Sequence, residues 1–343
     1  MKKLLITFFF SVFLLCLLAA GAFTYYKFEL GTPVIGTDEH KIIEIVPGQS
    51  FNAVTKVLMS QGVLDTPWIM KFYGRFSGLS GQLKAGEYEL EGALTIPELV
   101  DVFVSGQSIQ YQITFVEGWT FKELLVELAK HDKLKKVVGG NKPLDILNSV
   151  TDLYQHPEGL FFPDTYTYRK NDSDLSILMR SFKRMQTVLD QEWKTKSKNL
   201  PIKTPYEALI LASIVEKETG DASEREQISG VFIRRLNKGM RLQTDPTVIY
   251  GMGDQYKGNI TRKDLKQYTP YNTYRINGLP PTPIALAGRE AIHAALNPDS
   301  GKSLYFVAKG NGLHYFSPTL KEHVNAVNKY QVYKRKKNYR SSN

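Results

Sequence analysis

The 343-residue sequence contains very little cysteine, with Cys16 as its single thiol. One thiol cannot form an intramolecular disulfide, and it cannot build a metal site from several cysteines. The stability of the fold must therefore come from its hydrophobic core.

Several motifs of common enzyme classes are also missing. The sequence has no His-Glu-x-x-His and no Gly-x-Ser-x-Gly, and Gly301-Lys302-Ser303 lacks the earlier glycine of a P-loop because Leu296 stands there. None of the histidines has the spacing of metal ligands (His40, His131, His156, His293, His314 and His323). These absences exclude a metalloenzyme, a serine esterase and a P-loop ATPase, and we expect neither a metal nor a cofactor.

The overall composition is that of a folded, basic protein. Hydrophobic residues make up 42% of the chain and charged residues 23%, which excludes wholesale disorder, and the length predicts two or more folded units. Lys and Arg total 44 against 34 Asp and Glu, a formal net charge of +10. This charge favours an anionic partner such as lipid, acidic glycan or nucleic acid, without choosing among them.

The amino-terminal segment predicts a membrane anchor. Residues 4–26 are uncharged, rich in Leu and Phe, and would rise roughly 34 Å as a helix, enough to cross a hydrocarbon core of ~30 Å. A cleaved signal peptide is the alternative because residues 20–22 resemble a cleavage site, but the apolar run is longer than that of a signal peptide. Lys2 and Lys3 predict a cytoplasmic amino terminus, so the rest of the chain would lie outside.

An internal repeat follows a short segment without periodicity. Residues 27–41 combine glycine, proline and charges and predict a stalk. Residues 44–58 and 114–128 then share, at a constant offset (114 − 44 = 70), an apolar strand, a glycine turn, a helix cap and an amphipathic helix. Ser50 and Thr120 occupy the two N-cap positions.

The first copy of the repeat begins a small predicted α/β subdomain at residues 42–110. An alternating segment at residues 83–90 predicts a strand, and residues 95–104 predict a helix capped by Thr95. The subdomain resembles the LysM module, which binds glycans that contain N-acetylglucosamine. The alternative is a structural unit that only positions its neighbours.

The rest of the chain predicts a second, larger region. Asn199-Leu200-Pro201 interrupts the helical pattern, and we expect a domain boundary there. The predicted parts, in chain order, are a transmembrane anchor at 1–26, the stalk at 27–41, the LysM-like subdomain at 42–110, the second repeat copy with connecting helices at 111–200, a catalytic domain at 201–330 and a basic tail at 331–343.

A buried helix over residues 205–219 carries two carboxylates near its end. It starts at Thr204 as N-cap, stops at Gly220 and is apolar nearly all round, so we expect it to be buried with its carboxyl end near a surface. Glu216 and Glu218 lie about 200° apart on the helical wheel and cannot serve the same site. Glu218 lies on the large apolar stripe, which raises the pKa of a carboxyl and suits it to general-acid catalysis, although a structural ion pair is the alternative.

Polar segments further along the chain supply more candidates. Gln243-Thr244-Asp245 predicts a turn that presents an amide, a hydroxyl and a carboxylate, or else a turn that only bonds its own backbone. Asn272 stands two residues before Tyr274, where it could hold a sugar amide or hydroxyl.

Three regular elements are predicted in the carboxyl-terminal part. A capping box at 223–226 predicts a helix that closes at Gly239. Residues 303–308 and 314–316 predict a β-hairpin, and residues 319–330 predict a helix.

Four segments taken together resemble the endolytic murein transglycosylase family, the MltG or YceG-like proteins. The similarity extends over nearly the whole chain and is most specific around Gln243. The segments are Ala212-Ser213-Ile214-Val215-Glu216-Lys217-Glu218-Thr219, Arg241-Leu242-Gln243-Thr244-Asp245-Pro246-Thr247-Val248-Ile249-Tyr250-Gly251, Tyr271-Asn272-Thr273-Tyr274 and Gly278-Leu279-Pro280-Pro281.

The resemblance implies an α+β fold and an activity on the cell wall. It implies cleavage of the β-1,4 bond between N-acetylmuramic acid and N-acetylglucosamine in nascent peptidoglycan, without water, to leave 1,6-anhydro ends. The family's essential glutamate corresponds to Glu218. The residues expected to bind substrate are Glu216, Gln243, Thr244, Asp245, Asn272 and Tyr274.

The resemblance also implies partners and a location. We expect a single-pass protein of the inner membrane with a periplasmic catalytic domain, acting on glycan strands beside penicillin-binding proteins of the elongation machinery, and not on nucleic acid. Two alternatives remain. One is a two-carboxylate muramidase with Asp245 or Glu216 as the second group, and the other is a non-catalytic, membrane-tethered scaffold that binds peptidoglycan.

Overall fold

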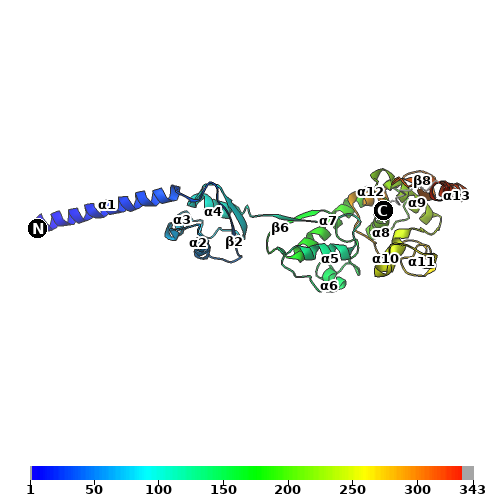
Figure 1. Ribbon diagram of the computed structural model, residues 1–343, viewed down its shortest axis with the longest axis horizontal. Helices are drawn as coiled ribbons and strands as arrows, with labels where there is room; N and C mark the ends of the chain where they lie inside the picture. The colour runs from blue at the N-terminus through cyan, green and yellow to red at the C-terminus, as the bar shows by residue number, and fades with distance from the viewer. Residues whose placement is uncertain (1, 334–343) are drawn as a thin grey trace. The chain divides into compact units, whose positions relative to one another are not determined.

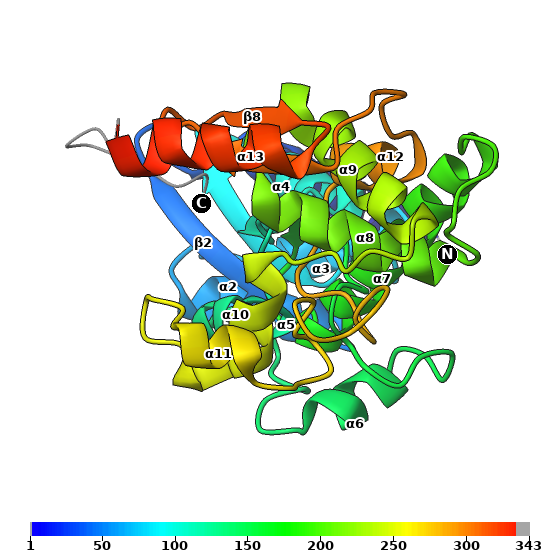
Figure 2. The same cartoon turned by 90° about the vertical axis from the view of Figure 1, so that its right-hand side faces the viewer.

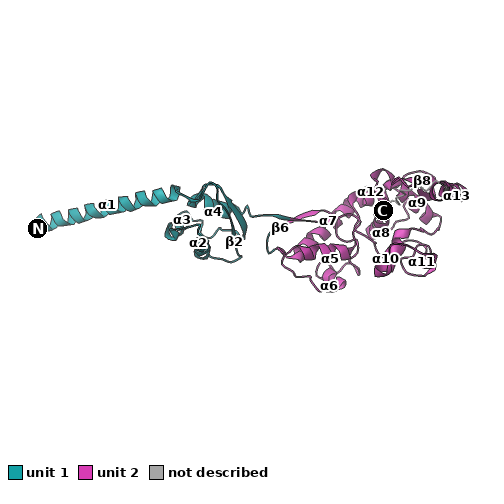
Figure 3. Cartoon of the chain, in the orientation of Figure 1, with its two compact units in different colours: residues 1–111, 169–171 teal, residues 112–168, 172–343 magenta. Residues whose placement is uncertain are grey.

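A computed structural model describes residues 2–333 and shows a mixed α+β protein (Figure 1). Contacts divide the chain into two compact units (Figure 3). Unit 1 is Met1–Tyr111 with Arg169–Asn171, and unit 2 is Gln112–Tyr168 with Asp172–Asn343. The predicted border at residue 110 lies next to this division, whereas the predicted border near residue 200 falls inside unit 2. Residues 334–343 of the predicted basic tail lie outside the described residues.

Helix α1 (Lys2–Gly31) begins unit 1. It is long and apolar enough to cross a membrane, and none of its residues is buried by the rest of the protein. These properties fit a single-pass anchor. The helix continues beyond the predicted end of the anchor at residue 26.

The segment predicted as a stalk belongs in part to the folded unit. Residues 27–41 contain the end of α1, strand β1 (Pro33–Ile35) and the start of β2. Strand β1 pairs antiparallel with β4 (Leu94–Thr95), and Ile35 is fully buried in the core of unit 1. Burial of this isoleucine is the physical reason that residues 33–35 are ordered against the unit.

The core of unit 1 lies between a pair of antiparallel strands and three short helices. Strand β2 pairs with β3 from His40 opposite Glu91 to Ile45 opposite Gly86, and Ile43 and Ile45 point into the core. The elements are β2 (His40–Ile45), α2 (Phe51–Ser60), α3 (Pro67–Phe76), β3 (Gly86–Glu91) and α4 (Ile96–Ser105). Helix α3 was not predicted from the sequence.

Unit 2 is mainly helical, with two small two-stranded sheets. Strand β5 pairs with β6, and β7 pairs with β8. Its elements up to residue 224 are β5 (Tyr111–Thr114), α5 (Phe121–Lys130), α6 (Pro143–Asn148), β6 (Thr165–Tyr168), α7 (Asp174–Lys194), α8 (Pro205–Glu218) and the 3-10 helix η1 (Ala222–Glu224). The remaining elements are α9 (Arg225–Asn237), α10 (Asp245–Met252), η2 (Gly253–Gln255), α11 (Arg262–Lys266), α12 (Arg289–Leu296), β7 (Tyr305–Ala308), β8 (His314–Ser317), α13 (Leu320–Val327) and the π-helix η3 (Asn328–Tyr333).

Helix α8 forms the centre of unit 2. It packs against α7, α9, α10 and α12, and its residues from Ala208 to Val215 are all buried. Figure 2 shows α13 and β8 above the level of α8, and α10 and α11 below it. Helix α8 is thus buried, as its apolar sequence predicted.

The two copies of the internal repeat have the predicted local structure. Gly48 and Gly118 have positive φ values of 83° and 79°, which only glycine adopts easily, so each turn needs this residue. The side chain of Ser50 accepts a hydrogen bond from Ala53 N at the start of α2, and Thr120 forms a full capping box at the start of α5.

Two local predictions were wrong. Ser223 does not cap a helix, because the Asp221 carboxylate accepts the hydrogen bond from Ser223 N and a 3-10 turn precedes α9. The Gln-Thr-Asp-Pro segment was predicted as a turn, but Thr244 is the N-cap residue of helix α10 and Asp245 is its first residue.

A substitution at Gly74 tests the packing of α2 on α3. The added methyl group of Gly74→Ala would lie 2.3 Å from Cζ of Phe51, a buried ring of α2. We expect a loss of about 1–3 kcal/mol in the free energy of unfolding of unit 1, measured by urea denaturation. Gly62→Ala is no suitable control because its φ is positive, whereas Gly81→Ala has open space and should have little effect. Equal stability of Gly74→Ala and wild type would contradict the described contact.

Candidate active site

Glu218 is the last residue of α8 and lies at the edge of a groove. The helix residues that share its face, Leu211, Ile214 and Val215, are completely buried. The Glu218 side chain is only partly buried, so the carboxyl leaves the apolar interior where the helix ends. Position and surroundings agree with those expected from the helical wheel.

The groove is formed by segments that are far apart in the sequence. Its volume is ≈ 440 Å³, and it lies between the start of α10 on one side and β7, β8 and α13 on the other. The predicted site residues that line it are Glu218, Gln243, Thr244, Asp245 and Tyr274.

Two hydrogen bonds organise the polar groups of the groove. Thr244 Oγ1 donates to Glu218 Oε1. Tyr274 Oη donates to Asp245 Oδ1 at 2.6 Å. Burial and the neighbouring Asp245 carboxylate raise the pKa of Tyr274, so this phenol remains a proton donor in the neutral range.

Glu218 has the electrostatic properties of a proton donor. Burial raises the pKa of Glu218 to about 7, the Thr244 hydrogen bond opposes this shift, and the negative charge of Asp245 adds to it. The carboxyl therefore changes its protonation state near neutral pH, where a general acid is most effective.

The loop before α10 is held in an unusual backbone conformation. Gln243 has a φ of 52°, which is uncommon for a residue with a side chain. Gln243 N donates to Thr273 O at 3.2 Å, and Thr244 N donates to Thr273 Oγ1 at 3.0 Å. These bonds fix Thr244 where its hydroxyl reaches Glu218.

Arg235 is a site residue that sequence reasoning missed. Its guanidinium donates to Leu242 O at 2.9 Å and to Gln243 Oε1 at 3.3 Å, and it also lies over the ring of Tyr305. An arginine within the apolar pattern of α9 was the available signal. It indicated a buried cation that needs several acceptors, but not which loop provides them.

The carboxyl-terminal segment contributes a wall of the groove that was also missed. Tyr305 stacks on His323 at 5.2 Å between ring centroids, and both residues line the groove. His314 lines it too, with Nδ1 2.8 Å from Glu224 Oε2. The sequence predicted the hairpin and helix that carry these rings but not that they face Glu218.

Glu216 does not line the groove. Its Oε1 lies 3.2 Å from Nη2 of Arg225, and its Oε2 accepts a hydrogen bond from Gly288 N at 2.9 Å. Burial raises the pKa of Glu216, while these two partners act in the opposite direction. The geometry is that of a structural ion pair that joins α8 to α9 and to the start of α12.

Asn272 also has a structural environment. It is 1% exposed, and its Nδ2 donates to three backbone oxygens, those of Asp264, Leu265 and Gln267. Its Oδ1 accepts from Tyr274 N at 3.0 Å. Both polar atoms of the Asn272 side chain therefore form hydrogen bonds with the backbone of the protein. Through these bonds Asn272 shapes the loop that carries Tyr274.

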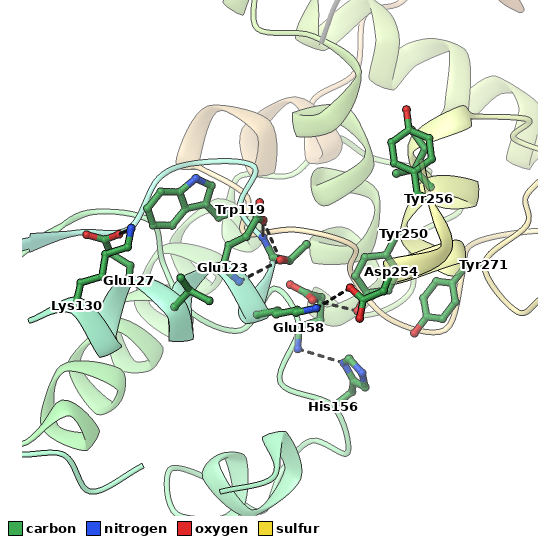
Figure 4. Close-up of a pocket in the computed structure, with 15 residues that line it drawn as sticks. Trp119, Glu123, Glu127, Lys130, His156, Glu158, Tyr250, Asp254, Tyr256 and Tyr271 are labelled. Atoms are coloured by element: carbon green, nitrogen blue, oxygen red, sulfur yellow. Dashed lines mark hydrogen bonds and ion pairs between the residues drawn. The ribbon is translucent and has the colours of Figure 1, made fainter. Parts of the chain in front are cut away.

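A second, larger cavity of ≈ 810 Å³ lies between α5 and the end of α10 (Figure 4). Glu158 stands in it, accepting hydrogen bonds from Phe121 N and from Tyr250 Oη, and burial raises the pKa of Glu158 to about 7. Charged side chains at its rim pair with one another, as Lys122 does with Asp254. Glu158 thus connects α5 to α10, and the charged groups have partners without a ligand.

No metal site is found in the groove among the described residues. The one group of His, Asp and Glu side chains with suitable spacing in residues 2–333 is His40, Glu89 and Glu91, on the surface of unit 1. All three are exposed, and exposed acidic groups are common without a metal.

Comparisons with known proteins agree with one another. The YceG-like family matches residues 43–329 of this chain. A Bacillus subtilis (strain 168) protein named endolytic murein transglycosylase is 33% identical, covering 92% of this chain and 91% of that protein. A Streptococcus pneumoniae serotype 2 protein of the same name is 28% identical over 92% of this chain, which spans 63% of that longer protein. A crystal structure of a yceG-like protein from Listeria monocytogenes is 31% identical, with a TM-score of 0.52 over 84% of this chain and 99% of that one.

The raised pKa of Glu218 predicts a pH-dependent effect of its replacement on stability. The folded chain holds this proton up to a pH of about 7, whereas the unfolded chain releases it near the ordinary value of 4.5. Ionisation therefore favours unfolding as the pH rises between these values. Relative to wild type, Glu218→Gln should gain stability across this range, by at most about 3 kcal/mol, and no more above it.

Chemical denaturation of both proteins at a series of pH values measures this difference. Glu226→Gln, which removes an exposed carboxylate from α9, controls for the loss of one charge. A difference between wild type and Glu218→Gln that stays constant from acid to neutral pH would show that the Glu218 carboxyl is not withdrawn from water.

The buried amide of Asn272 predicts a loss of stability on its removal. Asn272→Ala leaves three carbonyl oxygens without their shared donor, and we expect a decrease of about 2–4 kcal/mol in the free energy of unfolding. Gln243→Asn is the matched control, because it changes an exposed amide in the groove and tolerates the positive φ. If Asn272→Ala unfolds at the same denaturant concentration as wild type, the structural role is wrong.

Proposed function

This chain belongs to the YceG-like family, and from that premise we propose that it is a membrane-anchored endolytic lytic transglycosylase. It cleaves the β-1,4 bond between N-acetylmuramic acid and N-acetylglucosamine in nascent peptidoglycan and leaves 1,6-anhydro ends. The observation that carries the proposal is a carboxyl with a pKa of about 7, Glu218, at the edge of a groove lined by polar side chains. The names of the relatives support the same activity.

The proposed reaction uses Glu218 twice. Its protonated carboxyl donates a proton to the glycosidic oxygen, which leaves with the electron pair of its bond to C1 of the muramoyl residue. The C6 hydroxyl oxygen of the same residue forms the new bond to C1, and its proton passes to the Glu218 carboxylate. The enzyme returns to its starting state, and no water is consumed.

A pKa near neutrality suits both halves of this cycle. A carboxyl with an ordinary pKa would be ionised at pH 7 and could not begin the reaction, whereas one with a much higher pKa would be a poor donor. Burial against the apolar stripe of α8 raises the pKa of Glu218, and the hydroxyl of Thr244 limits the rise. Thr244 also orients the carboxyl through its hydrogen bond.

The remaining groove residues are proposed to bind the sugar. The amide of Gln243 and the carboxylate of Asp245 are exposed there and can bond N-acetyl groups and hydroxyls. The hydroxyl of Tyr274 fixes the orientation of Asp245. Glu216 and Asn272 act indirectly, because they hold α8 and the Tyr274 loop in place.

A muramidase that uses two carboxylates is a second candidate, favoured by one observation. Asp245 lines the same groove as Glu218, so it could activate water as the second group. Glu216 cannot take this role from its position beside Arg225. The two reactions differ in their products, since hydrolysis leaves reducing ends.

The finer features of the anchor and of unit 1 belong to the same proposal. We place the amino terminus in the cytoplasm and the catalytic unit in the periplasm of a cell with an inner membrane, near penicillin-binding proteins. Residues 42–110 are proposed to act as a LysM-like subdomain. The order β2, α2, α3, β3, with the two strands antiparallel, supports this interpretation.

Product analysis tests the proposed function. Purified glycan strands digested with the full chain should yield anhydro-muramoyl ends, and Glu218→Gln should reduce their rate of formation by roughly 10²-fold or more. Mass spectrometry identifies the ends, and Glu226→Gln serves as the control with unchanged activity. The Gln variant should fold normally.

Three other outcomes would contradict the proposal. Reducing ends that depend on both Glu218 and Asp245 would identify a muramidase. Absence of any cleavage by the wild-type chain would leave the non-catalytic scaffold, and full activity of Glu218→Gln would refute the assignment of the acid.

A further inference from the structure

Helix α3 of unit 1 exposes a row of aromatic side chains. Trp68, Phe72 and Phe76 are 50%, 46% and 71% exposed, and their spacing of four residues places them on one side of the helix. Ile69, which lies next to this row on the helix, and Met70, on the opposite side, are completely buried in the core. Helix α3 therefore carries more large apolar side chains than the core of unit 1 encloses.

This aromatic row begins at the end of the membrane-spanning part of α1. The ring of Trp68 stacks on Tyr25 with 6.4 Å between centroids, and Phe72 meets Tyr26 edge to face at 5.3 Å. Tyr26 also packs against the core of unit 1. Figure 1 shows α3 near the end of α1, so the anchor itself holds the row close to the membrane surface.

Basic side chains accompany the aromatic rings. Lys71 and Arg75 lie three and seven residues after Trp68, and α3 contains no Asp or Glu. Together with Trp68 and Phe72 they line a hollow of ≈ 600 Å³ that reaches to the start of α2. A hollow with two cations at an aromatic rim suits the phosphate of a lipid headgroup.

The chemistry of this surface matches a bilayer interface better than open water. Tryptophan and other aromatic residues gather at the headgroup level, where the ring is in an apolar layer and its polar edge stays hydrated. Lys and Arg close to an anionic membrane are attracted to its surface. A large exposed apolar patch is otherwise unfavourable for a soluble surface.

We propose that α3 lies in the interface of the membrane that α1 spans, with Trp68, Phe72 and Phe76 among the headgroups and with Lys71 and Arg75 on anionic lipid phosphates. Unit 1 is then attached to the membrane by two elements instead of one. This second contact fixes which face of unit 1 lies against the membrane surface. The proposal concerns unit 1 alone and does not depend on the reaction at Glu218.

Tryptophan fluorescence in lipid nanodiscs tests the contact with the full chain. The chain has three tryptophans, so variants that keep only Trp68, only Trp119 or only Trp193 can be compared. In nanodiscs of brominated phosphatidylcholine with phosphatidylglycerol, the Trp68 emission should be strongly quenched and the other two should not. Each of these variants carries two substitutions. The single substitution Trp68→Phe should abolish the quenching by lipid and gives the same test in an otherwise unchanged chain.

A second comparison tests the contribution of the Lys71 and Arg75 charges to membrane contact. Lys71→Gln with Arg75→Gln should reduce the quenching of Trp68 in nanodiscs with phosphatidylglycerol and leave it unchanged in nanodiscs of phosphatidylcholine alone. Lys56→Gln, on α2, is the matched control. If Trp68 is quenched by iodide in solution and not by brominated lipid, the row faces water or another protein and the proposal is wrong.

Discussion

The withdrawal of one carboxyl, that of Glu218, from water is the constraint on which the groove of unit 2 depends. Helix α8 is buried over almost its whole length, and Glu218 stands at the point where it leaves the core. Because the helix is packed on several sides, the backbone that carries this carboxyl is held in place at the edge of the groove. The cost of burying its charge appears as a pKa of about 7.

The loop at residues 241–244 orients the Glu218 carboxyl, because its Thr244 hydroxyl donates a hydrogen bond to Glu218 Oε1. A backbone with positive φ at Gln243 is unfavourable by itself and needs external support. Arg235 and Thr273 provide it through hydrogen bonds from α9 and from the Tyr274 loop. The support comes from two segments distant in the sequence, so the position of Thr244 beside Glu218 depends on how they pack together. Such preorganisation limits the rearrangement that the groove needs during a reaction.

Unit 1 differs from unit 2 in its helix α3, whose exposed side chains include Trp68, Phe72 and Phe76. Its core is complete without Trp68 and Phe76, and both rings stay exposed next to the anchor. The internal repeat gives α2 and α5 the same local start, yet the two helices serve different units. Both helices bury an apolar face, and α5 in addition forms a wall of the cavity that contains Glu158.

The sequence by itself determined the features that depend on close neighbours in the chain. Periodicity and caps predicted the repeat, α8, the carboxyl-terminal hairpin and the place of Glu218 on an apolar stripe, because such patterns act over one or two helical turns. Only the tertiary structure decided that Thr244 reaches Glu218, that Arg235 holds the loop, and that Asn272 and Glu216 turn away from the groove. Those contacts join segments separated by many residues, and their meeting depends on how the helices pack, which no local pattern records.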